Sequence, residues 1–399
     1  MQRREMLLGL GSAAAISTAA RAGEGLNLDP MLPEGTREEA VLASPPGKSR
    51  LIRLADRPLN YETQVQAFRE AITPNEQFFV RYHLTDLPNE NSFNGWKLEI
   101  AGEKTVRLSM SDLTDLPQTD LTAVCQCSGN RRGLFQPHVA GVQWGLGAMG
   151  CATWRGPRLR DVLAKAGVAQ DAIEVWLDGA DGPALPTTPD FRKSVPMKKA
   201  MADETIVAVA MNGAPLPLTN GFPARLVVGG WTATYWVKHL SRIEVSSKPL
   251  DSFWMQKAYR VPAGMFPVNL PFASQNKDTD WPITEMVVNS VIAEPLAGDQ
   301  VARSGFTVRG VAWDRGSGIG RVDVSLDGGK TWQNALLDQN LGPYAFRRFT
   351  LNTGPVARGK AVLAVRATSN AKETQATVLK QNPAGYQNNV PHLVPVTVA

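Results

Sequence analysis

The sequence feature that most restricts the fold is a set of short alternating segments near the C-terminal end of the chain. Residues 306–313, 321–326 and 360–366 alternate apolar and polar side chains, which is the pattern of half-buried strands. Asp327-Gly328, directly after the second segment, is a hairpin signal. Short strands with turns between them and no long helical pattern predict a β-sandwich of immunoglobulin type over residues 282–399.

A second domain is expected before the sandwich, because 399 residues exceed what one hydrophobic core usually organises. The 28 prolines and 35 glycines predict many turns and short strands. A helix is nevertheless expected over 159–166, where apolar residues recur with helical spacing between Gly156-Pro157 and Gly167. We therefore predict an α+β fold class, with a mixed α/β domain over 23–281 ahead of the sandwich.

The N-terminal residues have the pattern of an export signal. Arg3-Arg4 precedes an apolar run over 6–20, and Ala20-Arg21-Ala22 has the small-x-small form of a signal-peptidase site. The run is too short and too rich in small residues for a membrane span. We therefore expect residues 1–22 to be a twin-arginine signal peptide and the mature protein to be periplasmic.

The net charge gives little support to a nucleic-acid partner. Loss of residues 1–22 removes three arginines and one glutamate and lowers the net charge from +5 to +3. This excess is too small to indicate nucleic-acid binding, but it is compatible with a local basic funnel for a small anion. We therefore expect neither a nucleic-acid partner nor a membrane span.

The cysteines indicate a free thiol rather than a disulfide framework. Cys125, Cys127 and Cys151 form an odd set, and an exported protein with disulfides usually has an even one. The sequence has no Cys-x-x-Cys-His, so we expect no haem on this chain. It also has neither a dinucleotide-binding fingerprint nor a P-loop. Electrons released by a redox reaction would then pass to another protein.

Two of these cysteines belong to a compact motif, Cys125-Gln-Cys127-Ser-Gly-Asn-Arg-Arg132, which follows a strand-like run over 121–124 and turns at Gly129-Asn130. A thiolate is a soft metal ligand, and adjacent arginine lowers the pKa of a thiol. Arginine also recognises oxyanions with two parallel hydrogen bonds. The motif is compatible with a cysteine-ligated metal that handles an anion, and also with a buried structural cysteine beside surface arginines.

The segment Cys127-Ser-Gly-Asn-Arg-Arg132 resembles the molybdenum-ligand motif of the sulfite oxidase family of molybdopterin enzymes. The resemblance implies that Cys127 binds molybdenum, which a single molybdopterin carries, in a sulfite-oxidase-type domain. It also implies that the C-terminal sandwich forms a homodimer, and that Arg132 helps to bind the substrate anion.

Further residues of the resemblance occur in the family's order along the chain. A strand over 78–83 would place Phe79, Arg81 and His83 on one face. In the family such a segment borders the cofactor and its arginine faces the substrate. Tyr259 matches the family's active-site tyrosine by its spacing after Lys238.

The resemblance also implies a set of pterin contacts. Arg225 and Lys238, from two neighbouring segments, suit the phosphate of a pterin. Asp181 and Trp236 are further implied contacts, the latter sharing a face with Lys238 if residues 230–238 form a strand. Asn220 stands where vertebrate and plant members have histidine; asparagine can form a hydrogen bond but carries no charge.

The sequence departs from the family at the substrate pocket. Many members send an arginine into the pocket from a Trp-Asn-Leu-Arg-Gly segment, whereas this chain reads Gln381-Asn-Pro-Ala384-Gly385. Either another basic residue such as Arg366 takes that place, or the pocket carries less positive charge. Trp144 could wall the pocket, although a buried tryptophan is more often core.

Our first hypothesis is a periplasmic sulfite dehydrogenase that oxidises sulfite to sulfate and passes electrons to an external c-type cytochrome. A second keeps the cofactor but changes the substrate, as in a sulfane dehydrogenase subunit or a periplasmic sulfoxide reductase. A third, from a different class, is a non-catalytic exported binding protein.

Overall fold

The computed structural model describes residues 41–399 except 267, 271 and 273–278. The predicted signal peptide, residues 1–22, lies outside the described residues. Within the described part of the chain, no helix is long and apolar enough to cross a membrane.

Helices are few and short among the described residues, and the longest α-helix has six residues. The helix predicted over 159–166 is confirmed as α2, which begins at Leu159 and is followed by Gly167 with φ of 83°. The fold is therefore mostly β, with less helix than the predicted α+β class implies. The α-helices are α1 (Met110–Thr114), α2 (Leu159–Ala164), α3 (Met197–Ala200) and α4 (Phe253–Gln256), and the 3-10 helices are η1 (Val65–Arg69), η2 (Asn75–Gln77), η3 (Glu90–Phe93), η4 (Arg132–Leu134), η5 (Leu218–Asn220) and η6 (Ala233–Tyr235).

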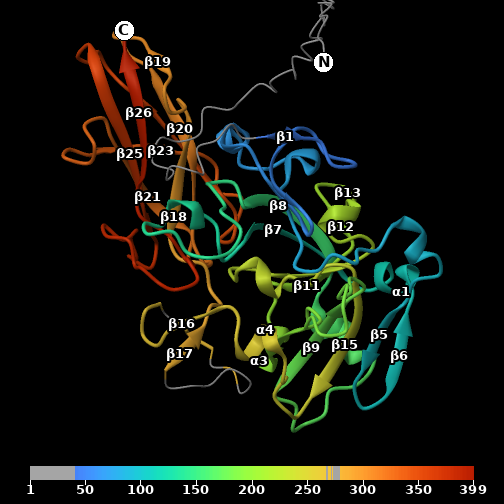
Figure 1. Ribbon diagram of the computed structural model, residues 1–399. Coiled ribbons are helices and arrows are strands. Elements are labelled where there is room, and N and C mark those ends of the chain that lie inside the picture. The colour runs from blue at the N-terminus through green and yellow to red at the C-terminus, as the bar shows by residue number, and fades with distance from the viewer. Residues whose placement is uncertain (1–40, 267, 271, 273–278) are drawn as a thin grey trace, which may run out of the picture.

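Several small sheets build the part of the molecule that precedes residue 283, drawn from blue to yellow in Figure 1. In strand order these sheets are β1 (Leu42–Ala43), β2 (Leu51–Asp56), β3 (Leu59–Glu62) and β4 (Val80–Arg81); β10 (Lys193–Pro196), β9 (Glu174–Gly179), β15 (Leu240–Ser246), β5 (Leu98–Ala101) and β6 (Thr105–Leu108); β13 (Ala214–Pro215), β12 (Ala210–Met211), β8 (Met149–Pro157) and β7 (Gln118–Gln126); β11 (Thr205–Ala208) and β14 (Arg225–Val228); and β16 (Arg260–Pro262) and β17 (Asp280–Pro282).

The β7–β8 pair carries the cysteine motif. Its ladder continues to Gln126 opposite Met149, and the N–H of Cys127 then donates to the carbonyl of Ala148 at 2.9 Å. Gly150 is required opposite Cys125, because a Cβ there would lie 2.4 Å from the ring of Phe78. The pairing fixes the point at which the chain leaves the sheet.

Two sheets with a shared apolar core form the C-terminal part, drawn in orange and red in Figure 1. The three strands predicted there are confirmed as β20, β21 and β25. Asp327 makes the predicted turn, since its carboxylate accepts the N–H groups of Lys330 and Thr331 at 3.0 and 2.9 Å. The sheets are β18 (Asn289–Glu294), β20 (Thr307–Trp313), β24 (Arg347–Asn352) and β23 (Leu336–Leu337), and β19 (Gln300–Val301), β26 (His392–Val398), β25 (Gly359–Ser369), β21 (Ile319–Ser325) and β22 (Gln333–Asn334).

The C-terminal part packs directly on the β7–β8 pair, which Figure 1 shows between it and the remaining sheets. The indole N–H of Trp313 donates to Oε1 of Gln126, the residue directly before Cys127, at 2.6 Å. The N–H of Gln387 donates to the carbonyl of Ser128 at 3.1 Å. The loop that holds Cys127 is therefore supported from both parts of the molecule.

Candidate active site

One cavity brings together side chains from elements that are far apart in the sequence. It holds about 640 Å³ of space free of protein atoms, part of which is open to solvent. Most of the predicted site residues lie in its wall. The lining residues are Phe78, Phe79, Arg81, Tyr82, His83, Cys125, Cys127, Ser128, Asp181, Phe191, Thr219, Asn220, Arg225, Ala233, Thr234, Trp236, Lys238 and Tyr259.

Cys127 lies in the cavity wall, directly after β7. The turn predicted after it is present: the N–H of Asn130 donates to the carbonyl of Cys127 at 3.0 Å, and Oδ1 of Asn130 accepts from the N–H of Ala148 at 3.0 Å. Arg131 has φ of 68°, which tightens the turn. The thiol is therefore held by a loop with little freedom to move.

The other two thiols differ from Cys127 in their surroundings. Cys125 also lines the cavity, but its sulfur accepts from Nη2 of Arg225 at 3.8 Å. Burial raises the pKa of Cys125 to about 11 and that of Cys151 to about 12, so both remain thiols at neutral pH. Cys151 belongs to the apolar cluster between the two parts of the molecule.

The segment over 78–83 differs from its prediction. Only β4, Val80–Arg81, is strand, and side chains at both odd and even positions line the cavity. The two-face arrangement was wrong because the chain leaves the strand after Arg81. The guanidinium of Arg81 donates to Oδ1 of Asn60 at 3.2 Å and to the carbonyl of Tyr82, so it is oriented before any ligand binds.

His83 and Tyr259 form a hydrogen-bonded pair through Nε2 and the phenol hydroxyl. The ring of Phe191 stacks on His83 at 3.8 Å, with 10° between the planes. Loss of hydration and the neighbouring cations hold the pKa of His83 well below its usual range, and burial raises the pKa of Tyr259. Both groups are therefore neutral near pH 7.

Two basic side chains, Arg225 and Lys238, form a further part of the cavity wall. Arg225 packs against two indoles, with Cζ 4.9 Å from the ring centre of Trp154 and 5.6 Å from that of Trp236, and its Nη1 donates to the carbonyl of Asn220 at 2.9 Å. Nζ of Lys238 donates to the carbonyl of Thr219 at 3.1 Å. These groups form a preorganised site for an anion.

Two predicted pterin contacts are placed by loops rather than by a strand. The strand predicted over 230–238 is absent, because the chain forms the short η6 helix at Ala233–Tyr235. Trp236 and Lys238 nevertheless both line the cavity. Asp181 lies near Lys238, and burial raises the pKa of its carboxyl although Lys238 opposes the shift.

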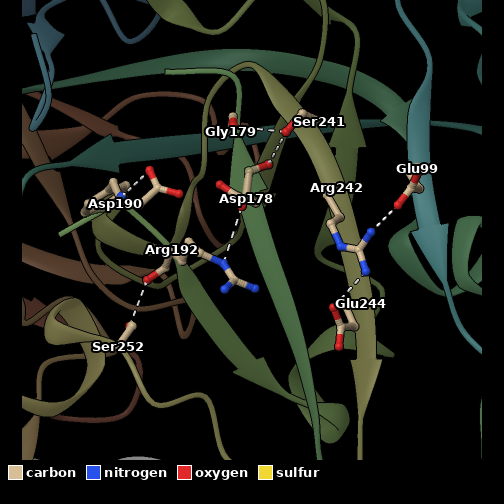
Figure 2. Close-up of polar contacts among 10 residues, drawn as sticks. Glu99, Asp178, Gly179, Asp190, Arg192, Ser241, Arg242, Glu244 and Ser252 are labelled. Carbon is tan, nitrogen blue, oxygen red and sulfur yellow. Dashed lines mark hydrogen bonds and ion pairs between the residues drawn. The ribbon is translucent and has the colours of Figure 1, made fainter. Parts of the chain in front are cut away.

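Figure 2 shows polar contacts around the loops that bring Asp181 and Phe191 to the cavity. The Ser241 hydroxyl donates to the carbonyl of Gly179 at 3.0 Å and joins β15 to the end of β9. Nε of Arg192 lies 3.4 Å from Oδ2 of Asp178, whose pKa partial burial raises to about 6. Both loops are therefore tied to the five-stranded sheet.

Arg132 lies outside the cavity wall, next to it. Its Nε donates to the carbonyl of Ala384 at 2.8 Å, and Nη1 donates to that of Val142 at 3.2 Å. A Cβ on Gly129 or Gly385 would lie 2.6 or 2.8 Å from this side chain, so glycines make the room for it. The two carbonyls occupy Nε and Nη1 of Arg132, and its predicted contact with the substrate would fall to Nη2.

Two predicted pocket residues do not line the cavity. Arg366 lies on β25, where its Nε is 3.4 Å from Oδ2 of Asp323 and its Cζ is 4.2 Å from the ring centre of Trp332. It therefore does not replace the arginine missing at Ala384. Trp144 is fully buried in the core and reaches the site only through Phe79, with ring centres 6.4 Å apart.

Sequence reasoning missed Lys48, in the segment before β2. Its Nζ donates to the carbonyl of Asn75 at 2.5 Å and to Oδ1 of Asn220. Burial lowers the pKa of Lys48 to about 7. No local pattern marks this lysine, because its partners lie 27 and 172 residues away. Lys48 places an amine behind Asn220 that is only partly protonated at neutral pH.

Comparison with known proteins identifies the family. Residues 84–254 match the oxidoreductase molybdopterin binding domain, and residues 280–399 match the Mo-co oxidoreductase dimerisation domain. The mitochondrial sulfite oxidase of Macaca fascicularis is 36% identical over 364 residues, which are 86% of this chain and 65% of that protein. The sulfite oxidase of Arabidopsis thaliana is 31% identical over 317 residues, which are 75% of this chain and 78% of that protein. The chain belongs to the sulfite oxidase family of molybdopterin oxidoreductases.

A solved structure resembles this sulfite oxidase family member along almost its whole length. The sulfane dehydrogenase SoxCD from Paracoccus pantotrophus has a TM-score of 0.73, 26% identity and coverage of 96% of both chains. The chain spans 65% of the length of the macaque sulfite oxidase. The cofactor implied by these matches is molybdenum carried by molybdopterin.

The cavity fits this sulfite oxidase family cofactor. Among the described residues, buried polar atoms of four lining residues have no hydrogen-bond partner: Ser128 Oγ, Thr219 Oγ1, Thr234 Oγ1 and Arg225 Nε. Buried polar groups are rarely left unsatisfied, so this part of the wall is suited to a polar ligand. The thiol of Cys127 and the basic side chains of Arg225 and Lys238 in the same wall match a metal and an anionic pterin tail.

Proposed function

We propose that the protein is a sulfite dehydrogenase that oxidises sulfite to sulfate. The observation that carries the proposal is the meeting of Cys127, Arg81 and the His83–Tyr259 pair with the basic side chains of Arg225 and Lys238 in one cavity. The sulfite oxidase relatives support the choice of substrate. Sulfite and water give sulfate, two protons and two electrons, so an electron acceptor is required.

The cofactor, when bound, supplies the oxygen-transfer chemistry and accepts the two electrons. Cys127 would hold the metal, while Arg225, Lys238 and Asn220 would hold the polar tail of the pterin. All three tail residues line the cavity and are oriented by hydrogen bonds to their neighbours.

Substrate binding falls to three other lining residues of the cavity, Arg81, Tyr259 and His83. Arg81 is oriented by Asn60 and would offset the charge of the anion. Tyr259 keeps its proton near pH 7 and can donate a hydrogen bond to a substrate oxygen. His83 fixes the phenol from the other side, and the ring of Phe191 covers His83 and limits access of water.

The proposal includes the setting of the reaction. The protein would be exported through the twin-arginine pathway, act in the periplasm and pass its electrons to an external c-type cytochrome. The match of residues 280–399 to a dimerisation domain supports a homodimer. We also propose that domain boundaries lie at residues 22 and 281 and that the C-terminal two-sheet domain is of immunoglobulin type.

A second candidate is a sulfane dehydrogenase. The match to SoxCD covers 96% of both chains, and a pocket with Ala384 in place of arginine carries less positive charge. A sulfane sulfur on a carrier needs less compensation of charge than free sulfite does, so the same cavity is compatible with that substrate.

The test measures reduction of cytochrome c by molybdenum-loaded protein, with sulfite in one assay and a persulfide in a parallel assay. We expect sulfite-dependent reduction that is absent without enzyme. If the molybdenum-loaded protein reduces cytochrome c with the persulfide and not with sulfite, the second candidate replaces the first. If neither substrate gives reduction, both are wrong.

A further inference from the structure

A segment of the C-terminal part, residues 381–388, reaches the edge of the cavity and is held there rigidly. The carbonyl of Ala384 accepts from Arg132, and the N–H of Gln387 donates to Ser128. Asn382 brackets Tyr386: its Oδ1 accepts from the Tyr386 N–H at 2.9 Å, and its Nδ2 donates to the Tyr386 carbonyl at 2.9 Å. The backbone on both sides of Tyr386 is thus fixed.

The ring of Tyr386 lies between Arg132 and Tyr259. It stacks on Tyr259 with ring centres 5.5 Å apart and 19° between the planes. Cζ of Arg132 lies 5.1 Å from the centre of the Tyr386 ring. Only 8% of Tyr386 is exposed, so the contacts form in a water-poor environment where cation–π attraction is strengthened.

Tyr259 needs such support because its backbone is unusual. Its φ is 58°, in the left-handed region that side-chain-bearing residues rarely occupy. A conformation of this kind persists only where the surroundings impose it. Tyr259 is held by His83 at its hydroxyl and by Tyr386 against its ring.

We propose that Tyr386 is a positioning residue that holds the phenol of Tyr259 in its reactive place, braced from behind by Arg132. The inference rests on the proposed oxidation at this cavity, in which Tyr259 donates a hydrogen bond to the substrate. Tyr386 itself does not line the cavity. Residues 381–388 lack the family's pocket arginine. In this chain the same stretch contributes an aromatic ring that supports the active-site tyrosine.

The test uses holoenzyme and compares Tyr386→Ala with Tyr386→Phe in the sulfite assay. Loss of the stack in Tyr386→Ala is expected to lower kcat about three- to tenfold with little change in KM and full molybdenum content. Tyr386→Phe keeps the ring, and its kcat is expected to stay close to that of the wild type. Phe266→Ala is the matched control, because Phe266 belongs to the same apolar cluster but packs under Lys380.

A coupling measurement separates positioning from general damage. In a Tyr259→Phe background the hydroxyl to be positioned is gone, so Tyr386→Ala should change kcat by less than twofold there. Equal losses in both backgrounds, or a loss of molybdenum, would overturn the inference. So would a Phe266→Ala variant that loses as much kcat as Tyr386→Ala.

The two proposals fail in different ways. A wild-type holoenzyme that is inactive with sulfite removes the proposed function. A crystal structure of Tyr386→Ala then decides the positioning role without any assay: we expect the Tyr259 hydroxyl to move away from His83. An unmoved Tyr259 in that structure would overturn the inference.

Discussion

The phenol hydroxyl of Tyr259 and Nε2 of His83 share a hydrogen bond between two groups that are both neutral near pH 7. Because His83 carries no charge there, it fixes the phenol without drawing the proton from it. The hydroxyl is available as a donor to the substrate when His83 is the tautomer whose Nε2–H donates to the phenol oxygen, and the pair then behaves as one unit.

Replacement of Tyr259 by phenylalanine tests this unit. Tyr259→Phe removes the donor and keeps the ring that stacks on Tyr386, so kcat with sulfite should fall about 10²-fold, as for other preorganised donors. Molybdenum content should stay at the wild-type level, measured by elemental analysis. Loss of the metal would instead show that Tyr259 has a structural role.

Cys127 and Cys125 can be distinguished by metal retention. Cys127→Ser should lose molybdenum, because a hydroxyl is a poor substitute for a thiolate ligand. Cys125→Ser is the matched control, since it alters a neighbouring cavity thiol that already accepts from Arg225. Molybdenum per chain, measured on both proteins, checks the assignment, and equal retention would remove Cys127 as the ligand.

Arg81→Gln should raise the KM for sulfite about tenfold or more, because a hydrogen bond to a charged group contributes about 1.5–3 kcal/mol. Arg155→Gln is the control: Arg155 is half exposed on β8 and pairs with Asp120 at 2.8 Å. Steady-state kinetics on both variants checks the assignment. An Arg81→Gln enzyme with the wild-type KM would place Arg81 outside the substrate site.

Lys48 should contribute to cofactor retention. Lys48→Met keeps most of the side-chain volume but removes the donor to Asn220, and we expect the purified protein to lose pterin and molybdenum faster during dialysis. Lys104→Met, at an exposed position, is the control. Equal rates of loss in the two variants would limit Lys48 to a role in anchoring its own segment.

Glu62 gives a prediction about pH. Its carboxylate accepts the N–H of Gly145 at 2.8 Å and that of Gly147 at 2.6 Å, yet burial raises its pKa from 4.5 to about 7. Between these values the folded protein binds a proton that the unfolded chain does not. The stabilisation of the folded state by this proton is fully present below pH 4.5 and is lost as pH rises through 7.

The variant Glu62→Gln isolates this effect, because its amide does not titrate. The stability of the wild type relative to the variant should fall by about 3 kcal/mol between pH 4.5 and pH 8. Thermal melting of both proteins across this range measures the difference. A difference that stays constant with pH would mean that Glu62 is ionised in the folded protein throughout.

Local patterns in the sequence predicted the parts of the site that depend on neighbouring residues. The turn after Cys127, helix α2 and strands β20, β21 and β25 follow from turn residues and periodicity. The strand expected over 230–238 failed, because its apolar residues pack into the cavity wall as a loop with a short 3-10 helix. Because these residues are buried on all sides, the sequence lacks the apolar–polar periodicity that would have distinguished a strand from a loop.

Residues whose roles depend on distant partners could not be found in this way. Lys48 reaches Asn220 across 172 residues, and Arg132 meets the carbonyl of Ala384 across 252. Arg366 was proposed for the substrate site because its charge suited the pocket, but the strand that carries it directs it to Asp323 and Trp332. The charge of an arginine alone could not indicate which of several arginines the fold would place in the substrate site.

The stretch over 381–388 has a consequence for how such enzymes can be recombined. A chimera that joined the first 281 residues of this chain to the C-terminal domain of a relative would exchange the carbonyl that orients Arg132 and the ring behind Tyr259. Its catalytic behaviour would then depend on the source of the C-terminal domain, even though every cavity-lining residue came from this chain. The two domains therefore have to be exchanged together.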